Sequence, residues 1–379
     1  MVKKLGRIIK IFVLLLIAGA VIGIAGYFGY QWYEEHELNV NRPKVVKAQD
    51  GTNTNAAWYS NSFYQKQLKK KYSFINKVSN YVPPRTWDGK DFVIPGLIST
   101  KSYNFKTGNF DTATKMTPQG LTVAGKYILI TAYDGDHEHA SVIYVIDRRT
   151  GKYLKTIQVK GKPHLGGIAY DPVGKNVWLT GSIGKSSALM AFPVKEIGKY
   201  DEKRHSPIEY IHEISIPTLE RASTVTYYDN QLFVGLFNMY KRGRVASYTI
   251  SRSGKNKNSI SNNEIKSVTG TISWSDPDGV TSMDKQVQGI AIYDNKIFVS
   301  QSYGSKDSKL YIFPSTALHA LDEKNAELVI SMPPYLEQIV AYKGQLLCLF
   351  ESGSRQYAKP NIMIMDRILS ININALFGN

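Results

Sequence analysis

Five polar residues of differing chemistry each stand at the start of an apolar run, which makes them the first candidates for a functional site: Gln119, His164, Arg221, Gln288 and Glu337. His164 could act as a base or a metal ligand, and Arg221 could hold an anion through two parallel hydrogen bonds. Glu337 could serve as an acid or as a ligand. A purely structural repeat does not require this variety. The alternative for each residue is a hydrogen bond to the backbone of a neighbouring repeat.

Charged and aromatic residues also gather in three loops: His137, Glu138, His139, Tyr240, Arg242, Arg355 and Tyr357. The stretch "DGDHEHAS" contains candidate ligands for a divalent cation: Asp134, Asp136, His137 and His139. Carboxylate and imidazole groups both bind such ions, but these residues lack a recognised ligand spacing, so a solvated loop is the alternative. The basic loops with tyrosines would suit an acidic or sugar ligand through charge and ring stacking. A solvated basic turn is their alternative.

These candidates lie in a repeat. The stretch "PQGLTVAGKYILITAYD" at 118 is echoed by "LGGIAYDPVGKNVWLTGS" at 165, "ASTVTYYDNQLFVGLFN" at 222, "VQGIAIYDNKIFVSQSY" at 287 and "LEQIVAYKGQLLCLFES" at 336. Each copy reads as a strand, a turn and a second strand. A third strand follows as "SVIYVID", "SALMAFPV", "RVASYTI", "SKLYIFP" and "NIMIMD", and a fourth as "YLKTIQV", "EYIHEISI", "GTISWS", "ELVISM" and "ILSINI". Four strands in each unit of about 50 residues predict an all-β fold, a β-propeller, over residues 116–376.

Five copies favour a five-bladed propeller. Six blades remain the alternative, because "LISTKSYNF" at 97–105 could either close the ring as an outer strand or belong to a divergent sixth blade. The innermost strand of a blade runs along the central channel, so its start lies at one mouth. The loop between the second and third strands opens on the same face. This geometry predicts that the five polar residues form a ring at the channel mouth, flanked by the three loops.

The motifs "PQGL", "HLGGIAYD" and "VQGIAIYDNKIFVS", each set at a two-strand hairpin, carry a resemblance. In them the chain resembles the broad superfamily of secreted propellers that includes NHL-repeat, quinoprotein-like and SMP-30/gluconolactonase-like proteins. The resemblance implies the propeller fold. Propellers of this kind have unrelated activities, so the activity has to be argued from the site.

The N-terminal segment indicates a membrane anchor. Residues 1–10, "MVKKLGRIIK", are basic, and residues 11–33 carry no charge. An apolar run of this length can span a bilayer, and the basic flank favours a cytoplasmic N-terminus with the rest of the chain across the membrane. A signal peptide cleaved after "AGA" at 18–20 is the alternative. We expect an uncleaved signal anchor, and hence a single-pass protein of the cell membrane with an extracytoplasmic C-terminal domain.

Two further segments precede the propeller domain, which is predicted over residues 91–379. Residues 34–56 are mostly polar and lack periodicity, which indicates a tether. Residues 57–90 contain apolar residues at helical spacing with interspersed lysines, which predicts a basic amphipathic helix and a connector. This helix could lie on the membrane surface or pack on the propeller.

Charge and motifs limit the function. The chain of 379 residues has a formal charge of +16, which favours acidic partners, and an extracytoplasmic location argues against nucleic acid as one of them. The single cysteine, Cys348, lies in the apolar run "QLLCLF", where we expect a small buried hydrophobic residue. The motifs G-x-S-x-G, H-E-x-x-H and G-x-G-x-x-G are absent, and no cofactor is identified, although a divalent metal is possible.

The favoured hypothesis is a binding or scaffold module for an anionic cell-envelope polymer, a glycan or a protein partner. The alternative is a metal-dependent hydrolase or lactonase that uses the polar ring.

Overall fold

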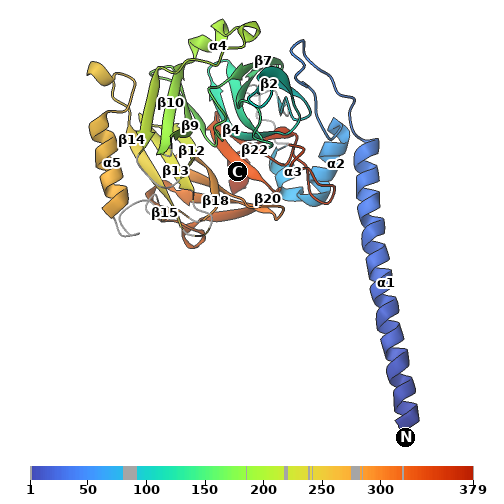
Figure 1. Cartoon of the computed structure of the whole chain (residues 1–379). Coiled ribbons are helices and arrows are strands. Elements are labelled where there is room, and N and C mark those ends of the chain that lie inside the picture. Colours follow the sequence, from blue (N-terminus) through green and yellow to red (C-terminus); the bar gives the residue numbers. More distant parts are fainter. Residues whose placement is uncertain are drawn as a thin grey trace.

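The computed structural model describes residues 2–79, 92–184, 186–216, 221–237, 240, 242–274, 282–283, 285–317 and 320–378. From residue 92 onward the chain forms a β-propeller whose five blades surround a common centre (Figure 1). The prediction of five blades is therefore confirmed, and the six-bladed alternative is wrong.

Each blade is an antiparallel sheet whose strands run in order from the channel outward. The first blade contains β4 Met116–Ala124, β5 Tyr127–Asp134, β6 Val142–Asp147 and β7 Tyr153–Gln158. The second contains β8 Ile168–Asp171, β9 Asn176–Ile183, β10 Ser186–Pro193 and β11 His212–Ile216. The third contains β12 Arg221–Tyr228, β13 Gln231–Phe237, β14 Gly243–Thr249 and β15 Ser282–Met283, beside which β19 Ala320–Leu321 lies parallel. The fourth contains β16 Val287–Tyr293, β17 Lys296–Gln301, β18 Ser308–Pro314 and β20 Leu328–Met332. The fifth contains β21 Leu336–Tyr342, β22 Gln345–Phe350, β23 Arg367–Asn372 and β1 Phe92–Val93.

The tight turns after the innermost strands explain why the repeat is visible in the sequence. In the third and fourth blades the turn residues are Asp229–Asn230 and Asp294–Asn295, and all four have φ between 44° and 64°. A two-residue hairpin of this type needs positive φ at both positions, which Asn, Asp and Gly adopt at low cost. Lys343–Gly344 meets the same requirement in the fifth blade, with φ of 48° and 77°.

Closure of the ring differs from the prediction. The outer strand of the fifth blade is β1, in which Phe92 pairs with Ile368. The predicted closing segment, 97–105, contributes instead to a separate hairpin of β2 Thr100–Asn104 and β3 Asn109–Ala113.

The prediction of "NIMIMD" as a third strand was also wrong. Met363 and Met365 are buried against the N-terminal helices, and the third strand is β23, which was predicted as the fourth. A buried irregular segment and a strand have the same apolar pattern.

The third blade contains a helix where the sequence predicted the fourth strand. Residues Asn262–Trp274 of "SNNEIKSVTGTISWSDPDGV" form helix α5, so most of the predicted fourth strand "GTISWS" is helical. The fourth strand is the short β15 instead. Ile265 and Val268, spaced three residues apart, pack on the core of this blade, which is the spacing of a helix face. One short helix, α4 Lys195–Lys199, lies between β10 and β11.

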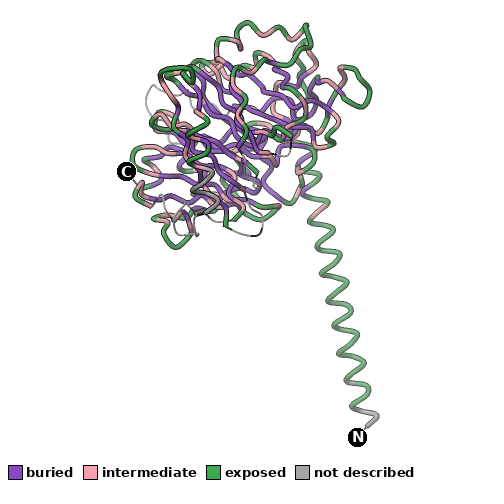
Figure 2. The backbone as a smooth tube through the Cα atoms, turned by 60° about the vertical axis from the view of Figure 1, so that its left-hand side comes forward, coloured by how far each residue is buried: buried purple, intermediate pink, exposed green. Residues whose placement is uncertain are grey.

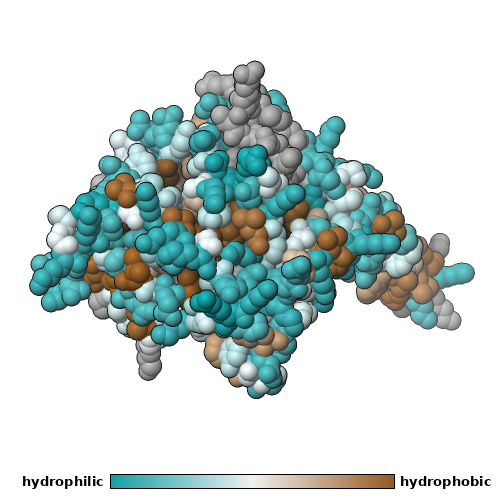
Figure 3. All heavy atoms as spheres, turned by 90° about the horizontal axis from the view of Figure 1, so that it is seen from above, coloured by the Kyte–Doolittle hydropathy of each residue, from teal (hydrophilic) through white to brown (hydrophobic). Residues whose placement is uncertain are grey.

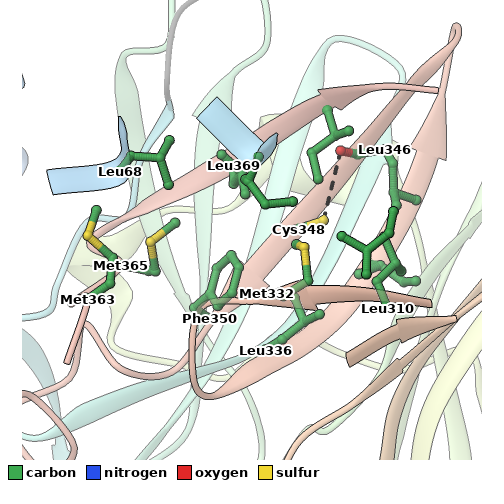
Figure 4. Close-up of a cluster of buried hydrophobic side chains, with 14 of the residues drawn as sticks. Leu68, Leu310, Met332, Leu336, Leu346, Cys348, Phe350, Met363, Met365 and Leu369 are labelled. Atoms are coloured by element: carbon green, nitrogen blue, oxygen red, sulfur yellow. Dashed lines mark hydrogen bonds between the residues drawn. The ribbon is translucent and has the colours of Figure 1, made fainter. Parts of the chain in front are cut away.

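The buried residues of the propeller lie mostly within its strands (Figure 2). Figure 4 shows Cys348 in the fifth blade surrounded by Leu310, Met332 and Leu336. Cys348 is fully buried, and burial raises the pKa of its thiol. The prediction of a small buried hydrophobic residue is confirmed. Most of the face shown in Figure 3 is hydrophilic, with hydrophobic atoms only in small groups.

Helix α1, Val2–Val40, projects away from the propeller and is exposed over most of its length (Figures 1 and 2). Its segment Leu5–Val40 is long and apolar enough to span a membrane, judged by length and composition. The C-terminal end of α1 packs on the folded domain, where Glu34 and Leu38 are buried. Lys71 Nζ lies 3.5 Å from the Glu34 carboxylate. The segment predicted as a tether, 34–56, therefore begins inside a helix that contacts the domain.

The predicted basic helix is two helices, α2 Asn61–Lys71 and α3 Ser73–Ser79, and residues 80–91 lie outside the described residues. Phe63, Tyr64 and Leu68 of α2 are buried in the core next to the fifth blade. Its lysines are mostly exposed: Lys66, Lys69 and Lys70. The helix thus packs on the propeller and presents its lysines to solvent, which is one of the two arrangements that its sequence allowed.

Candidate functional site

A bulge near the start of the innermost strand recurs in four of the five blades. The pairing register shifts at Gln119, at Ser223 and at Gln288, and in the fifth blade between Leu336 and Ile339. A bulge bends its strand and re-aims a side chain. A polar residue at this position can therefore face the channel mouth although the strand after it is buried.

All five residues of the predicted ring line one hollow at the channel mouth. Gln119, Gln288 and Glu337 occupy equivalent positions at the bulges. His164 and Arg221 do not: in their blades Gly166 and Ser223 hold the equivalent position, two residues later. Because Gly166 and Ser223 are small, the longer side chains of His164 and Arg221 can reach the hollow over them.

A second ring of lining residues lies at the ends of the second strands: Tyr133, Ser182, Phe237, Ser302 and Glu351. In each blade the residue after the ring position pairs with a residue of the second strand, as in Gly120↔Thr131 and Gly289↔Ser300. The lining residue follows this partner by two positions, as Tyr133 follows Thr131. The site residues predicted from the sequence did not include any of these five. The same alignment of repeat copies, extended to the second strands, would have found them.

Gln338 crosses the channel below the hollow. Its amide oxygen accepts hydrogen bonds from Leu121 N at 3.0 Å and Ile168 N at 2.9 Å. Its amide nitrogen donates to Ile168 O at 2.8 Å and Val225 O at 2.9 Å. A Cβ added to Gly120 would lie 3.0 Å from the Gln338 amide oxygen, so the glycine leaves room for this side chain. Gln338 also lines a separate cavity of about 310 Å³.

Hydrogen bonds between neighbouring blades are made by residues other than the predicted ring. Thr131 Oγ1 donates to Leu165 O at 2.8 Å, and Ser300 Oγ donates to Glu337 O at 2.8 Å. Within the described part of the chain, none of the five ring side chains bonds the backbone of a neighbouring blade. Hydrogen bonds to the backbone of other blades, the alternative role for the ring residues, are thus made by Gln338, Thr131 and Ser300 instead.

The hollow has two contiguous lobes. The central lobe, of about 410 Å³, lies over the channel and is lined by both carboxyl groups, Glu337 and Glu351. The second, of about 560 Å³, extends over the second blade. We call it the basic lobe because Lys162 and Arg221 line it and none of its described lining residues is acidic. The lobes share five residues: Tyr133, His164, Gly166, Arg221 and Ser223.

Glu337 and Glu351 form a coupled pair in the central lobe. Burial, and then the charge of Glu351, raise the pKa of Glu337 well above its usual range. Burial raises the pKa of Glu351 to about 8, although a hydrogen bond from Gln119 Nε2, 2.9 Å from Glu351 Oε2, acts in the opposite direction. Glu337 is 4% exposed, and no partner for its carboxyl group occurs among the described residues. Burial thus favours the protonated form of both carboxyl groups.

Three tyrosines surround these carboxyl groups. The rings of Tyr335 and Tyr357 lie 5.0 Å apart, and the Tyr357 hydroxyl interacts with that of Tyr133. Burial and the charge of Glu351 both raise the pKa of Tyr335 and of Tyr357, which places the phenols close to the carboxyl pair. Tyr335 has a φ of 65°, a backbone region that bulky residues seldom adopt.

The basic lobe combines charge with hydroxyl groups. Lys162 Nζ donates to His137 O at 2.7 Å, which fixes the ammonium group beside the lobe. Arg221 is exposed and has no ion-pair partner among the described residues. Hydroxyl groups of Thr180, Ser182 and Ser223 complete the lining. Cations with hydroxyl donors are the groups that bind phosphate and carboxylate.

His164 stands where the lobes meet, and its ring stacks on Tyr133 with centroids 4.3 Å apart. Water reaches the ring from the hollow, but protein atoms crowd it on its other sides. This burial, together with the positive charges of Arg221 and His137, lowers the pKa of His164 to about 4. At neutral pH the imidazole is therefore uncharged, and it can offer one N–H to a ligand.

The candidate metal ligands have partners within the protein. Asp134 accepts hydrogen bonds from the backbone of Glu138 and His139, and its Oδ2 lies 2.7 Å from His139 Nδ1. The other ring nitrogen, His139 Nε2, lies 2.5 Å from Asp111 Oδ1, and Asp136 pairs with Lys115 at 2.7 Å. Among the residues that the structure describes, no group of three or more His, Cys, Asp or Glu side chains is arranged to hold a metal ion.

Only two of the seven predicted loop residues line the hollow, His137 and Tyr357. Glu138 pairs with Lys106 at 2.8 Å, and Arg242 pairs with Asp322 at 3.0 Å. Tyr240 is 84% exposed. Arg355, also exposed, lies near Arg42 and lowers the pKa of that guanidinium after the larger effect of burial. His139 contacts Asp134 at the start of its own loop and Asp111 of β3.

No model of a known protein family matches the chain, and no curated protein matches it. Three solved structures resemble part of it. The hydrazine synthase of Kuenenia stuttgartiensis is 13% identical over 61% of this chain and 55% of its own, with a TM-score of 0.32. The Dos1 propeller is 11% identical over 70% of this chain and 61% of its own, with a TM-score of 0.33. A chain of the nidogen–laminin complex is 11% identical over 66% of this chain and 84% of its own, with a TM-score of 0.34. The chain thus spans less than two thirds of the first two. Likeness this distant carries no inference about function, and the resemblance to NHL-repeat, quinoprotein-like and SMP-30/gluconolactonase-like proteins stays a resemblance.

Proposed function

We propose that this protein is a binding module, anchored in the cell membrane by α1 with its propeller outside, that binds an anionic cell-envelope polymer or glycan in the hollow at the channel mouth. The observation that carries the proposal is the basic lobe, a hollow of about 560 Å³ with Lys162 and Arg221 and no acidic residue among its described lining. A formal charge of +16 adds a long-range attraction for polyanions.

The anchor and its orientation are argued from the N-terminus. Four basic residues precede the apolar run: Lys3, Lys4, Arg7 and Lys10. Positive charges of this kind stay on the cytoplasmic side, so the propeller that follows α1 is placed outside. The C-terminal end of α1 packs on the domain through Leu38, which keeps the anchor in contact with the propeller domain.

The test is a calorimetric titration of the full-length protein in a maltoside detergent with glycerophosphoglycerol, a phosphodiester without a cation. We expect binding at low salt that weakens as salt rises, because exposed charges are screened. Arg221→Gln should weaken binding by roughly ten- to hundredfold, since a hydrogen bond to a charged group contributes about 1.5–3 kcal/mol.

Arg242→Gln is the matched control, because Arg242 is a cation of the same face that does not line the hollow. Its affinity for glycerophosphoglycerol should equal that of the wild type. The proposal fails if the wild type shows no binding at low salt, or if the two arginine variants lose affinity equally.

The carboxyl pair favours hydrolysis as a second candidate. Glu351, with a pKa of about 8, is protonated at neutral pH and could give a proton to a leaving group. A metal-dependent mechanism would have to use these same carboxyl groups. Release of glycerol phosphate from poly(glycerol phosphate) by the wild type, lost in Glu351→Gln, would support this candidate, and intact polymer after prolonged incubation would exclude it for this substrate.

A further inference from the structure

The carboxyl groups of the central lobe lack a counter-charge. Glu337 is 4% exposed and has no partner among the described residues, and Glu351 accepts one neutral hydrogen bond from Gln119. Arg221 and Lys162 lie in the hollow, yet neither forms an ion pair with these carboxyl groups. Buried carboxylates are normally paired, because the ionised group is costly to remove from water. The lobe therefore has room and chemistry for a cation that the protein does not itself supply.

The surroundings of the carboxyl pair suit an ammonium group in particular. Tyr133, Tyr335 and Tyr357 line the lobe around the pair, and the last two rings lie 5.0 Å apart. Aromatic faces attract ammonium groups through the ring quadrupole, and clusters of aromatic rings are a common means of binding alkylated ammonium ions. Carboxyl groups beside such rings add direct charge. Aromatic and acidic groups thus converge on one small volume.

The two lobes are contiguous and have opposite chemistry. Tyr133, His164 and Arg221 line both of them, so one small ligand can reach from the cations of the basic lobe to the carboxyl pair. We propose that the hollow binds a zwitterionic phosphoryl–ammonium group, with the phosphate beside Arg221 and the ammonium among Tyr133, Tyr335, Tyr357, Glu337 and Glu351. This inference rests on the proposed function, because the phosphate takes the anion position assigned above.

Binding of the ammonium group is linked to protons. In the empty hollow burial raises the pKa values of both carboxyl groups and so favours their protonated forms. An ammonium ion favours the ionised forms and lowers these pKa values, so complex formation releases protons. Affinity should then rise with pH from 6 through about 8, the pKa of Glu351 in the empty hollow, and go on rising while Glu337 ionises.

The other groups that face the pair do not reverse this trend. Gln119 is neutral, and Arg221 keeps its charge throughout the range. His164 titrates at about 4, below the window. The phenols of Tyr133, Tyr335 and Tyr357 have raised pKa values and stay protonated. A phosphodiester probe has no titration of its own in this range, unlike a phosphomonoester.

The test compares glycerophosphocholine with glycerophosphoglycerol, two phosphodiesters of which only the first carries an ammonium group. With full-length protein in maltoside at pH 8, we expect the first to bind at least tenfold more tightly, with net proton release seen as a dependence of the heat on buffer ionisation enthalpy. The ratio of affinities should fall as the pH is lowered to 6. Glycerophosphoethanolamine shows whether a primary ammonium is accepted as well.

Variants locate the effect. Glu337→Gln and Glu351→Gln should bring the ratio of affinities close to one, whereas Glu138→Gln, an acidic residue of the same face outside the hollow, should keep the wild-type ratio. A wild-type ratio near one, with glycerophosphoglycerol bound through Arg221, overturns this inference and leaves the proposed function standing. Absence of binding by both probes overturns the proposed function itself. Because the ratio and the proton release are measured on the wild type, a misfolded variant does not remove the test.

The zwitterionic group could belong to a polymer or to a lipid. Protein in nanodiscs of phosphatidylglycerol, loaded with glycerophosphocholine, distinguishes the two sources. Displacement of the bound probe by phosphatidylcholine vesicles would support a lipid headgroup, and continued binding in their presence would support a soluble or polymer-borne group.

Discussion

Replacing Gln338 by leucine is expected to lower the free energy of unfolding by roughly 4 kcal/mol. The substitution removes the amide that bonds four backbone groups of three other blades, at Leu121, Ile168 and Val225. Each buried backbone group left without a partner costs about 1–3 kcal/mol, and a leucine of similar volume satisfies none of them. Thermal unfolding should show a Tm lower by roughly 10 °C.

Gln288→Leu is the control for this prediction. Gln288 lines the hollow in the fourth blade, next to Gly289, which is the residue equivalent to Gln338. The Gln288 amide has no partner among the described residues. Its replacement should change the stability by less than about 1 kcal/mol, as surface-type substitutions do. Equal Tm values for the two variants would show that Gln338 does not hold the blades together.

Asp366→Ala is expected to be almost as severe, with a loss of roughly 3–5 kcal/mol. Asp366 is fully buried, and its Oδ2 accepts hydrogen bonds from Trp58 N at 2.8 Å and Tyr59 N at 3.1 Å. Its Oδ1 lies 3.0 Å from Nε of Arg367, which is 2% exposed. Removal of the carboxylate leaves a buried guanidinium without its counter-charge and frees the backbone of the segment that precedes α2.

Loss of the Asp366 carboxylate should destabilise the segment before α2 more than the rest of the domain. Arg367 also donates to Tyr59 O at 2.7 Å and to Asn61 Oδ1 at 2.9 Å, so the pair joins the segment after α1 to the fifth blade. Hydrogen exchange of residues 58–64 should therefore accelerate in Asp366→Ala more than exchange in the first three blades. Asp322→Ala, which removes an exposed ion pair with Arg242 and a hydrogen bond from Asn325, should cost less than about 1 kcal/mol. Unchanged exchange at 58–64 would contradict the role given to Asp366.

The blade repeat could be predicted because its information is local. Turn residues such as Asp229–Asn230 and Lys343–Gly344 adopt positive φ, and the strands on either side are buried and apolar. Closure of the ring could not be predicted in this way. The two-residue strand at Phe92 is defined by its distant partner Ile368 rather than by any pattern of its own. The same applies to "NIMIMD", whose apolar residues pack on the N-terminal helices instead of joining a sheet.

The candidate site was accessible to the sequence only in part. Alignment of the repeats found five polar residues that line one hollow, because the start of an innermost strand has a fixed place in a propeller. It did not find that His164 and Arg221 lie two residues before the position of Gln119 in the repeat. The strand register that defines this position cannot be read from the sequence. The division into a basic lobe and a carboxyl pair with tyrosines depends on which side chains meet across blades. Residues such as Tyr133 and Glu351 lie more than 200 residues apart in the chain.

A structure of the full-length protein saturated with glycerophosphocholine tests the central claim most directly. The account predicts density in the hollow at the channel mouth, with the phosphate beside Arg221 and the ammonium group between Tyr335, Tyr357 and the carboxyl groups of Glu337 and Glu351. An empty hollow at a saturating concentration, or ligand bound at another face of the propeller, would contradict it.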